Sequence, residues 1–301
     1  MPEHLLGPHV VGRRVVVRRI VPGETGPSGG PAYADVLGVC RSWSDGVAVL
    51  ERESGEEVAI PVEEIVTGKP VPPRASVRAR VSARDAELHT AGLFPRVEVH
   101  PLGEWSIRWE PEVVGRLRRR ANSCLAMGPP GMPLPAALER VVEFYTARGR
   151  RPIVQVEQGS EVEDHVRAAG WEPIHGDALF LLASVAMLGR QLRPTAGLTR
   201  VETDGPRVLA TVPGPGIAAR AFGRASLDGD WLGIHDVLVD PAHRRQGLAR
   251  EVIAALLEWG AEQGARTIWL HVETSNEPAR ALYDSLGFTE HHRCRYYERP
   301  S

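Results

Sequence analysis

A short basic loop that contains glycine, placed between a strand and a helix, is the part of the sequence with the clearest chemistry. An apolar run ends at Leu238 and Val239, and a proline turn follows it. Backbone N–H groups lose their partners where a strand ends, glycine permits close approach, and a helix N-terminus favours an anion. We therefore predict a phosphate-binding loop, which comprises Arg244, Arg245, Gln246, Gly247, Leu248 and Ala249.

Side chains that can carry protons follow along the next strand and helix. The pattern of residues 267–272 predicts a strand. Side chains alternate between the two faces of a strand, so His271 and Glu273 are expected on the same face. Asn276 or the serine before it caps the next helix, and Tyr283 lies one turn before the end of that helix. Imidazole titrates near neutrality and could accept a proton, whereas a lone histidine on a strand is more often structural. Both roles stay open for His271.

Length and composition indicate a globular protein of two or three modest domains. The chain has 301 residues, of which 43% are hydrophobic and 25% are charged, and its formal net charge is −2. No basic field covers the whole chain, which argues against a nucleic-acid partner. The densest basic run is Arg118-Arg119-Arg120, and we predict that it is a solvated helix face rather than a phosphate-binding patch.

The cysteines argue against a disulfide framework and against a zinc site. Cys40, Cys124 and Cys294 are odd in number, far apart and never in a C-x-x-C pair. The N-terminus lacks a secretory pattern, and no run approaches the roughly 18 apolar residues that a membrane helix needs. We therefore expect a cytoplasmic protein with no membrane contact.

The first part of the chain has the pattern of short strands. Residues 12–65 contain several valine-rich runs, with turn signals at Asp45-Gly46 and Ser54-Gly55, and a proline-rich linker starts at residue 68. The segment resembles the SH3-like barrels that serve as docking modules. A protein partner for this barrel and a purely stabilising role remain equally open.

The rest of the chain repeats one order of elements. Helices are predicted over 133–148 and 248–263, each followed by a strand and a second helix, and the two copies align when Gly170 is set on Gly287. We predict an internal duplication. The first copy lacks the Arg-x-x-Gly-x-Ala loop, and its counterparts of Asn276 and Tyr283 fall near Gly159 and Val166. This copy is therefore expected to pack and not to catalyse.

Together, the loop at 244–249 and the segment from Asn276 to Phe288 resemble the GNAT superfamily of acetyl-CoA-dependent N-acetyltransferases. The resemblance covers residues 205–298, and residues 270–276 and 295–297 are similar to the protein N-terminal alanine acetyltransferases. The layout is also similar to a group of actinobacterial three-part acetyltransferases.

The resemblance implies an α/β protein (the α+β GNAT fold) built from tandem GNAT-like halves, the first of them degenerate. The implied domains are a small SH3-like β-barrel at 1–80, a degenerate GNAT-like domain at 95–195 and a GNAT acetyltransferase domain at 196–301. The family usually places two helices beside the acceptor site, but residues 196–207 are too short for them. The middle domain or its loop at 122–135 is expected to supply that wall.

The resemblance also implies acetyl-CoA as cosubstrate, with no metal. The loop at 244–249 would bind the pyrophosphate through main-chain N–H groups, and its two arginines would add charge. Leu238 and Val239 would pair with the pantetheine arm and direct a backbone N–H at the thioester carbonyl. Asn276 would contact coenzyme A, cap its helix, or do both.

For catalysis, the resemblance implies that Tyr283 protonates the departing thiolate. A phenol with a pKa near 10 suits a thiol whose pKa is about 8.5, although packing is the competing interpretation of this residue. His271 stands where the alanine acetyltransferases have a glutamate, which makes it a candidate general base. Glu273, His235 and Asp236 are further candidates, and water could carry the proton instead.

The function implied is acetyl transfer to a primary amine of a small molecule, peptide or protein by direct attack. The alternative is a regulatory or interaction module that binds coenzyme A and whose catalysis is slow or lost. Nucleic-acid binding by the barrel ranks third.

Overall fold

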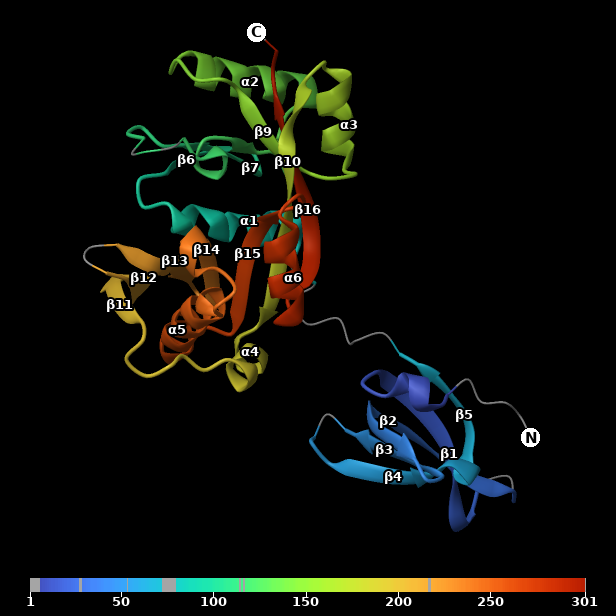
Figure 1. The fold of residues 1–301 in the computed structure, drawn as a ribbon. Coiled ribbons are helices and arrows are strands. Elements are labelled where there is room, and N and C mark those ends of the chain that lie inside the picture. The colour runs from blue at the N-terminus through green and yellow to red at the C-terminus, as the bar shows by residue number, and fades with distance from the viewer. Residues whose placement is uncertain are drawn as a thin grey trace. The chain divides into compact units, whose positions relative to one another are not determined.

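The computed structural model describes residues 6–300, apart from residues 27, 28, 53, 72–79, 114, 116, 216 and 217. The chain divides into two compact units, Met1–Arg80 and Val81–Ser301. Each unit has its own sheet and its own core (Figure 1).

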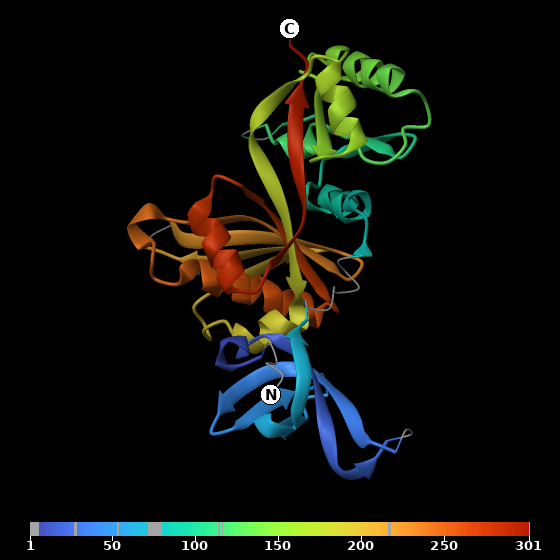
Figure 2. The same ribbon diagram turned by 90° about the vertical axis from the view of Figure 1, so that its right-hand side faces the viewer.

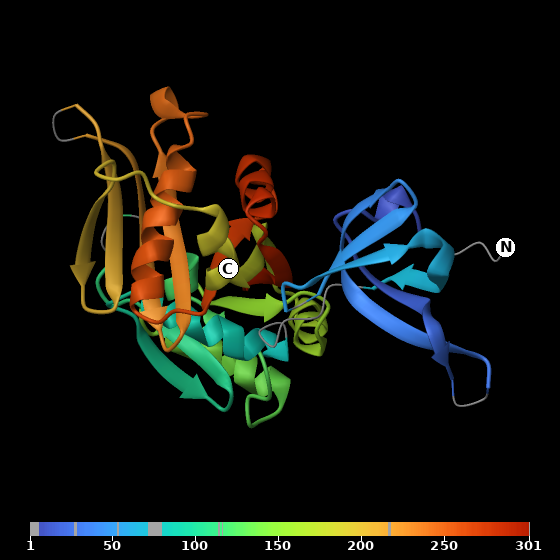
Figure 3. The ribbon, with the colours of Figure 1, turned by 90° about the horizontal axis from the view of Figure 1, so that it is seen from below.

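The first unit is a five-stranded antiparallel sheet of order β4-β3-β2-β1-β5. Asp45 and Gly46 make the tight turn between β2 and β3 with φ angles of 51° and 75°, at the position that the sequence predicted. The strands curve around a common interior (Figure 3), which Val15, Val36 and Leu50 fill. The comparison with SH3-like barrels stays a prediction. The elements are η1 (Pro8–Val10), β1 (Arg14–Thr25), β2 (Pro31–Ser44), β3 (Val47–Glu51), β4 (Glu57–Pro61), η2 (Val62–Glu64) and β5 (Ile65–Pro70).

The second unit is built on one sheet of 11 strands, in the order β11-β12-β13-β14-β15-β10-β16-β9-β8-β7-β6. Its strands are β6 (Glu98–Leu102), β7 (Trp105–Trp109), β8 (Cys124–Leu125), β9 (Ile153–Glu157), β10 (Glu172–Ser184), β11 (Arg200–Asp204), β12 (Arg207–Pro213), β13 (Ala219–Asp228), β14 (Trp231–Val239), β15 (Thr267–Glu273) and β16 (Thr289–Glu298). Its helices are α1 (Ala83–Leu88), α2 (Leu134–Thr146), α3 (Glu161–Ala168), α4 (Val185–Gln191), α5 (Leu248–Glu262) and α6 (Glu277–Ser285), with 3-10 turns η4 (His89–Leu93), η5 (Arg119–Ala121) and η6 (Pro241–His243).

The predicted duplication is present in the order of the elements. The series α2-β9-α3-β10 recurs as α5-β15-α6-β16, and the second helix of each series ends at a left-handed glycine, Gly170 or Gly287. Ser160 caps α3 by accepting a hydrogen bond from the Glu163 N–H, as its sequence predicted. The copies differ before their first helix, where β8 has 2 residues and β14 has 9.

The two halves of this sheet share two long strands. The end of β10 near Ser184 pairs with both β15 and β16, whereas its start near Glu172 pairs with β16 alone. The last residues of β16 in turn pair with β9 of the other half. Figure 2 shows β10 and β16 running side by side through both halves. The expected division near residue 195 therefore falls inside one continuous sheet.

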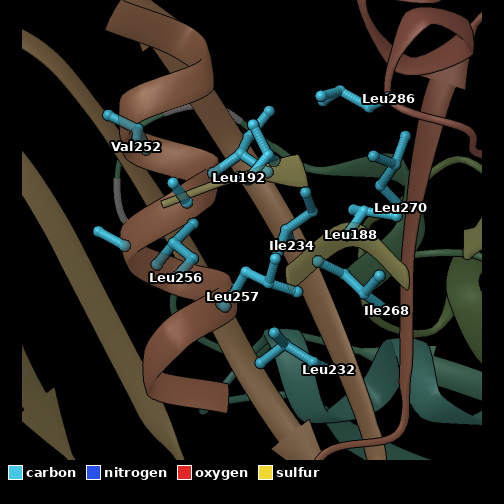
Figure 4. Packing of buried hydrophobic residues seen from close by; sticks show 14 of the residues in the cluster. Leu188, Leu192, Leu232, Ile234, Val252, Leu256, Leu257, Ile268, Leu270 and Leu286 are labelled. Carbon is cyan, nitrogen blue, oxygen red and sulfur yellow. The ribbon is translucent and has the colours of Figure 1, made fainter. Parts of the chain in front are cut away.

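Helices α4, α5 and α6 cover one face of the C-terminal half-sheet. Leu256 and Leu257 of α5 point at the strands, where Leu232, Ile234 and Leu270 meet them in a buried cluster (Figure 4). Burial of a side chain of this size contributes about 1.5–3 kcal/mol.

The segment α1–η4, to which the sequence analysis assigned no element, covers the opposite face. Ala86 and Leu93 pack there against Phe180 and Trp269, whose rings stack at 4.9 Å. A Cβ added to Gly233 would lie 2.5 Å from the Trp269 ring. This glycine therefore lets Trp269 lie against the sheet at the last paired residues of β14 and β15.

Candidate functional site

The site starts where β14 and β15 separate. These parallel strands pair only from Trp231 to Gly233 on β14, opposite Thr267 to Trp269 on β15. Beyond Gly233, β14 keeps its partner β13 on one side, and no described strand pairs with it on the other. The backbone edge at Leu238 and Val239 is thus open toward β15.

The predicted phosphate-binding loop joins this open strand to α5. Arg245 and Gly247 have left-handed φ angles of 62° and 79°, and Gly247 is the N-cap of α5. Residues 244–247 are exposed, while Leu248 is buried in the core. The N–H groups of a first helical turn have no acceptor within their helix. A Cβ on Gly247 would meet nothing within 4 Å, so packing does not require a glycine here. Glycine instead permits the left-handed backbone conformation and leaves the backbone of the loop accessible.

A pocket of about 260 Å³ lies where the two strands have separated. His235 of β14 and His271 of β15 border it, each two residues beyond the last strand pair, and Asp236 and Glu273 lie beside them. The structure therefore brings together all four candidate bases. The remaining lining residues are Phe94, Leu117, Arg118, Arg119, Arg120, Gly176, Ala178 and Tyr296.

Asp236 occupies a strained backbone position and carries a fixed charge. Two residues of β14 oppose one of β13 at this bulge, and Asp236 has a φ of 52°. Its carboxylate lies 3.4 Å from the His235 imidazole, 3.0 Å from Arg118 and 3.3 Å from Arg224. The contact with His235 and then the two guanidinium groups hold the pKa of Asp236 well below its usual range. Such a weakly basic carboxylate is a poor general base.

His271, for which the sequence leaves a structural role and a role as base open, has an enclosed side chain. Its side chain is 0% exposed, and its Nε2 lies 2.6 Å from Oε1 of Glu87. Burial lowers the pKa of His271 to about 4. Its Nδ1 is buried without a hydrogen-bond partner among the described residues.

The other two candidates differ in exposure. His235 is also largely enclosed, and burial lowers its pKa. Glu273 is 54% exposed and lies 3.6 Å from Arg119. Of the four candidates, Glu273 therefore exchanges protons with solvent most easily.

The sequence analysis missed Glu87, a fully buried carboxylate on α1. Its Oε1 accepts hydrogen bonds from His271 and from the Cys294 thiol at 3.1 Å, and lies 3.3 Å from Nε2 of His292. Its Oε2 accepts from Thr90 at 3.1 Å. Burial alone would raise the pKa of Glu87, but the two histidines outweigh it and lower the pKa. This Glu87 cluster ties α1 to β15 and β16.

The basic run predicted to be a solvated helix face is instead part of the pocket wall. Arg118 donates to Asp236 at 3.0 Å, and Arg119 donates to the backbone carbonyl of His175 at 2.9 Å. Arg120 lines the same pocket and is partly buried. Beside the separated strands, the pocket lining includes Phe94 and residues 117–120, and the latter belong to the predicted middle domain. That the middle domain forms the wall of the acceptor site stays a prediction.

Tyr283 has the contacts expected of a packing residue, and Asn276 has the contact expected of a helix cap. Tyr283 is 8% exposed, its ring is edge-on to Phe288 at 5.6 Å, and burial raises its pKa to about 12. Oδ1 of Asn276 accepts from the Ala279 N–H at 3.3 Å, which caps α6. Neither contact tests the roles that the resemblance implies.

Part of the chain is similar to known proteins. Residues 184–297 match the family described as "Probable histone acetyltransferase Rv0428c C-terminal". The [Ribosomal protein bS18]-alanine N-acetyltransferase of Escherichia coli is 42% identical over 74 residues, which are 25% of this chain and 49% of that protein. The chain thus spans about half the length of the first curated relatives that it matches.

Solved structures agree on the fold. A GCN5-related N-acetyltransferase from Kribbella flavida has a TM-score of 0.57 and 18% identity, over 73% of this chain and 96% of that one. A functionally unknown conserved protein from Staphylococcus epidermidis has a TM-score of 0.51 and 9% identity, over 74% of this chain and 99% of that one. At identities of 18% and 9%, these two likenesses show a shared fold. Among the described residues, no helix has the length and apolar character to span a membrane.

The Glu87 cluster predicts that stability falls in mild acid. Unfolded histidine titrates near 6.5, whereas folded His271 titrates at about 4, so stability present above pH 6.5 is lost as the pH falls toward 4. In that window, the free energy of unfolding should drop by up to about 1.4 kcal/mol per pH unit for this group. Denaturant unfolding at pH 7, 6 and 5 measures the slope.

His271→Gln should flatten that slope, while the exposed His165→Gln should leave it unchanged. Equal slopes for the wild type and His271→Gln would show that His271 is not responsible.

Proposed function

We propose that the protein transfers an acetyl group from acetyl-CoA to a primary amine by direct attack, without a covalent enzyme intermediate. The observation that carries this proposal is the open edge of β14, which a short segment with η6 connects to the exposed, left-handed Gly247 at the start of α5. The short β8 of the other half has no equivalent loop before α2. The C-terminal half is therefore the one that we expect to bind acetyl-CoA.

The loop suits a pyrophosphate. Residues 244–247 are exposed, and the first turn of α5 offers N–H groups that lack partners within the helix. Arg244 and Arg245 can add charge there. The peptide-like amides of the pantetheine arm would pair with the open edge at Leu238 and Val239, and a backbone N–H on that edge would stabilise the oxyanion.

The amine would approach from the pocket on the other side of the strands. An ammonium group must lose a proton before it can attack, and Glu273 at the pocket rim is the candidate most open to solvent. His235 and Asp236 border the same space, and His271 would act through its contacts rather than by touching substrate. The departing thiolate must then gain a proton, which we assign to the phenol of Tyr283.

A module that binds coenzyme A with slow or lost catalysis is the second candidate. The enclosure of Tyr283 and His271 favours it, because neither side chain has free access to solvent. Release of coenzyme A in the presence of amines separates the two candidates, since both bind the cosubstrate and only the enzyme consumes it.

Gly247→Glu should abolish binding of acetyl-CoA. The substitution strains a φ of 79° and places a carboxylate among the N–H groups that would hold the pyrophosphate. With millimolar acetyl-CoA, the wild type should show a rise in melting temperature that this variant lacks.

Gly264→Glu is the matched control, because Gly264 follows α5 with a φ of 89° and its Cβ would also meet nothing within 4 Å. This control should keep the shift. Absence of any shift in the wild type would refute the cosubstrate assignment.

Tyr283→Phe should reduce turnover by about 10²-fold, because it removes the proton donor and keeps the ring. Its ring packs against Phe288, so the melting temperature and the acetyl-CoA shift should change little. Steady-state release of coenzyme A measures the turnover. Unchanged turnover would leave Tyr283 with a packing role alone.

A further inference from the structure

Arg120 lines the pocket, and no salt bridge to it is found in the part of the chain that the structure describes. Asp236 is engaged by Arg118 at 3.0 Å, and Glu273 lies 3.6 Å from Arg119. Within the described ranges, no carboxylate forms an ion pair with Arg120. Arg120 can therefore form an ion pair with an anionic group of a bound ligand.

The other groups that face the pocket do not cancel this charge. The arginines contribute three positive charges, and Asp236 and Glu273 contribute two negative ones. Both histidines of the lining, His235 and His271, have lowered pKa values and are neutral near pH 7. The lining side chains themselves carry one excess positive charge, and the buried carboxylate of Glu87 lies behind His271.

Tyr296 provides a second, independent indication of a ligand. This residue lines the same pocket and is 3% exposed, yet its hydroxyl has no hydrogen-bond partner among the described residues. A buried hydroxyl without a partner is costly and is rare in native proteins. A carboxylate bound beside Arg120 could accept a hydrogen bond from Tyr296, so one ligand group would satisfy both side chains.

We propose that the acetyl acceptor carries a carboxylate as well as its amine, as a free amino acid does, and that Arg120 and Tyr296 bind this carboxylate. The inference rests on the proposed function. A pocket of about 260 Å³ suits such a small molecule. A lysine-rich protein tail would bring further positive charge to a lining that already has an excess of it.

Matched acceptor pairs test the proposal with the full chain and acetyl-CoA. Free amino acids and their C-terminal amides are compared by release of coenzyme A, with kcat/KM expressed per concentration of unprotonated amine. We expect the acids to be preferred by about 10-fold or more, because a hydrogen bond to a charged group would be lost with the amide. Equal or better use of the amides would overturn the proposal.

Substitutions test whether Arg120 and Tyr296 cause the preference for acids over amides. Arg120→Gln and Tyr296→Phe should raise KM for the acids by a larger factor than KM for the amides, and Arg120→Lys should restore part of the preference. Arg140→Gln, an exposed change on α2, is the control. Equal losses for acids and amides in Arg120→Gln would show a structural role instead.

A failure of the proposed function has a different signature. If no amine releases coenzyme A, the same amino acids are tested for a rise in melting temperature in the presence of coenzyme A. A rise that Arg120→Gln removes would support the carboxylate site without catalysis. No rise in the wild type would refute the site itself.

Discussion

The separation of β14 from β15 is the constraint on which the rest of the site depends. Two parallel strands that stay paired satisfy each other's backbone groups, whereas these pair over three residues each and then part. The separation leaves an edge of β14 without a described partner strand and a pocket lined by residues of both strands. Gly233 and Trp269 mark the point of separation, because only a residue without a Cβ lets the Trp269 ring lie there.

Strands that part need support from elsewhere, and the structure provides it on both sides of the sheet. Helix α5 packs its leucines on one face, and α1 with η4 covers the other. The buried carboxylate of Glu87 joins α1 to His271 on β15 and to Cys294 on β16. The other half also contributes to the C-terminal half through the long strand β10.

Local signals explain what could be predicted from the sequence. Helix α5 was predicted over 248–263 and runs from Leu248 to Glu262, since apolar periodicity and a following glycine define such a helix within its own sequence. The duplication was visible for the same reason. The sharing of β10 and β16 between the two halves could not be predicted, because periodicity indicates that a strand exists but does not indicate which strand pairs with it. Likewise, nothing in the sequence around Glu87 or Arg120 shows that tertiary contacts bring both to the separated strands. His271 was singled out from the sequence as a candidate base, and the structure places it in the pocket lining with its side chain enclosed beside Glu87.

Hydrogen exchange of the full chain, with and without acetyl-CoA, tests the central claim most directly. If the open edge and the loop hold the cosubstrate, amides in residues 237–239 and 245–250 should exchange more slowly when it is bound. The segment before α2 in the other half should not change. Slower exchange elsewhere, with these two segments unaffected by bound acetyl-CoA, would contradict the account.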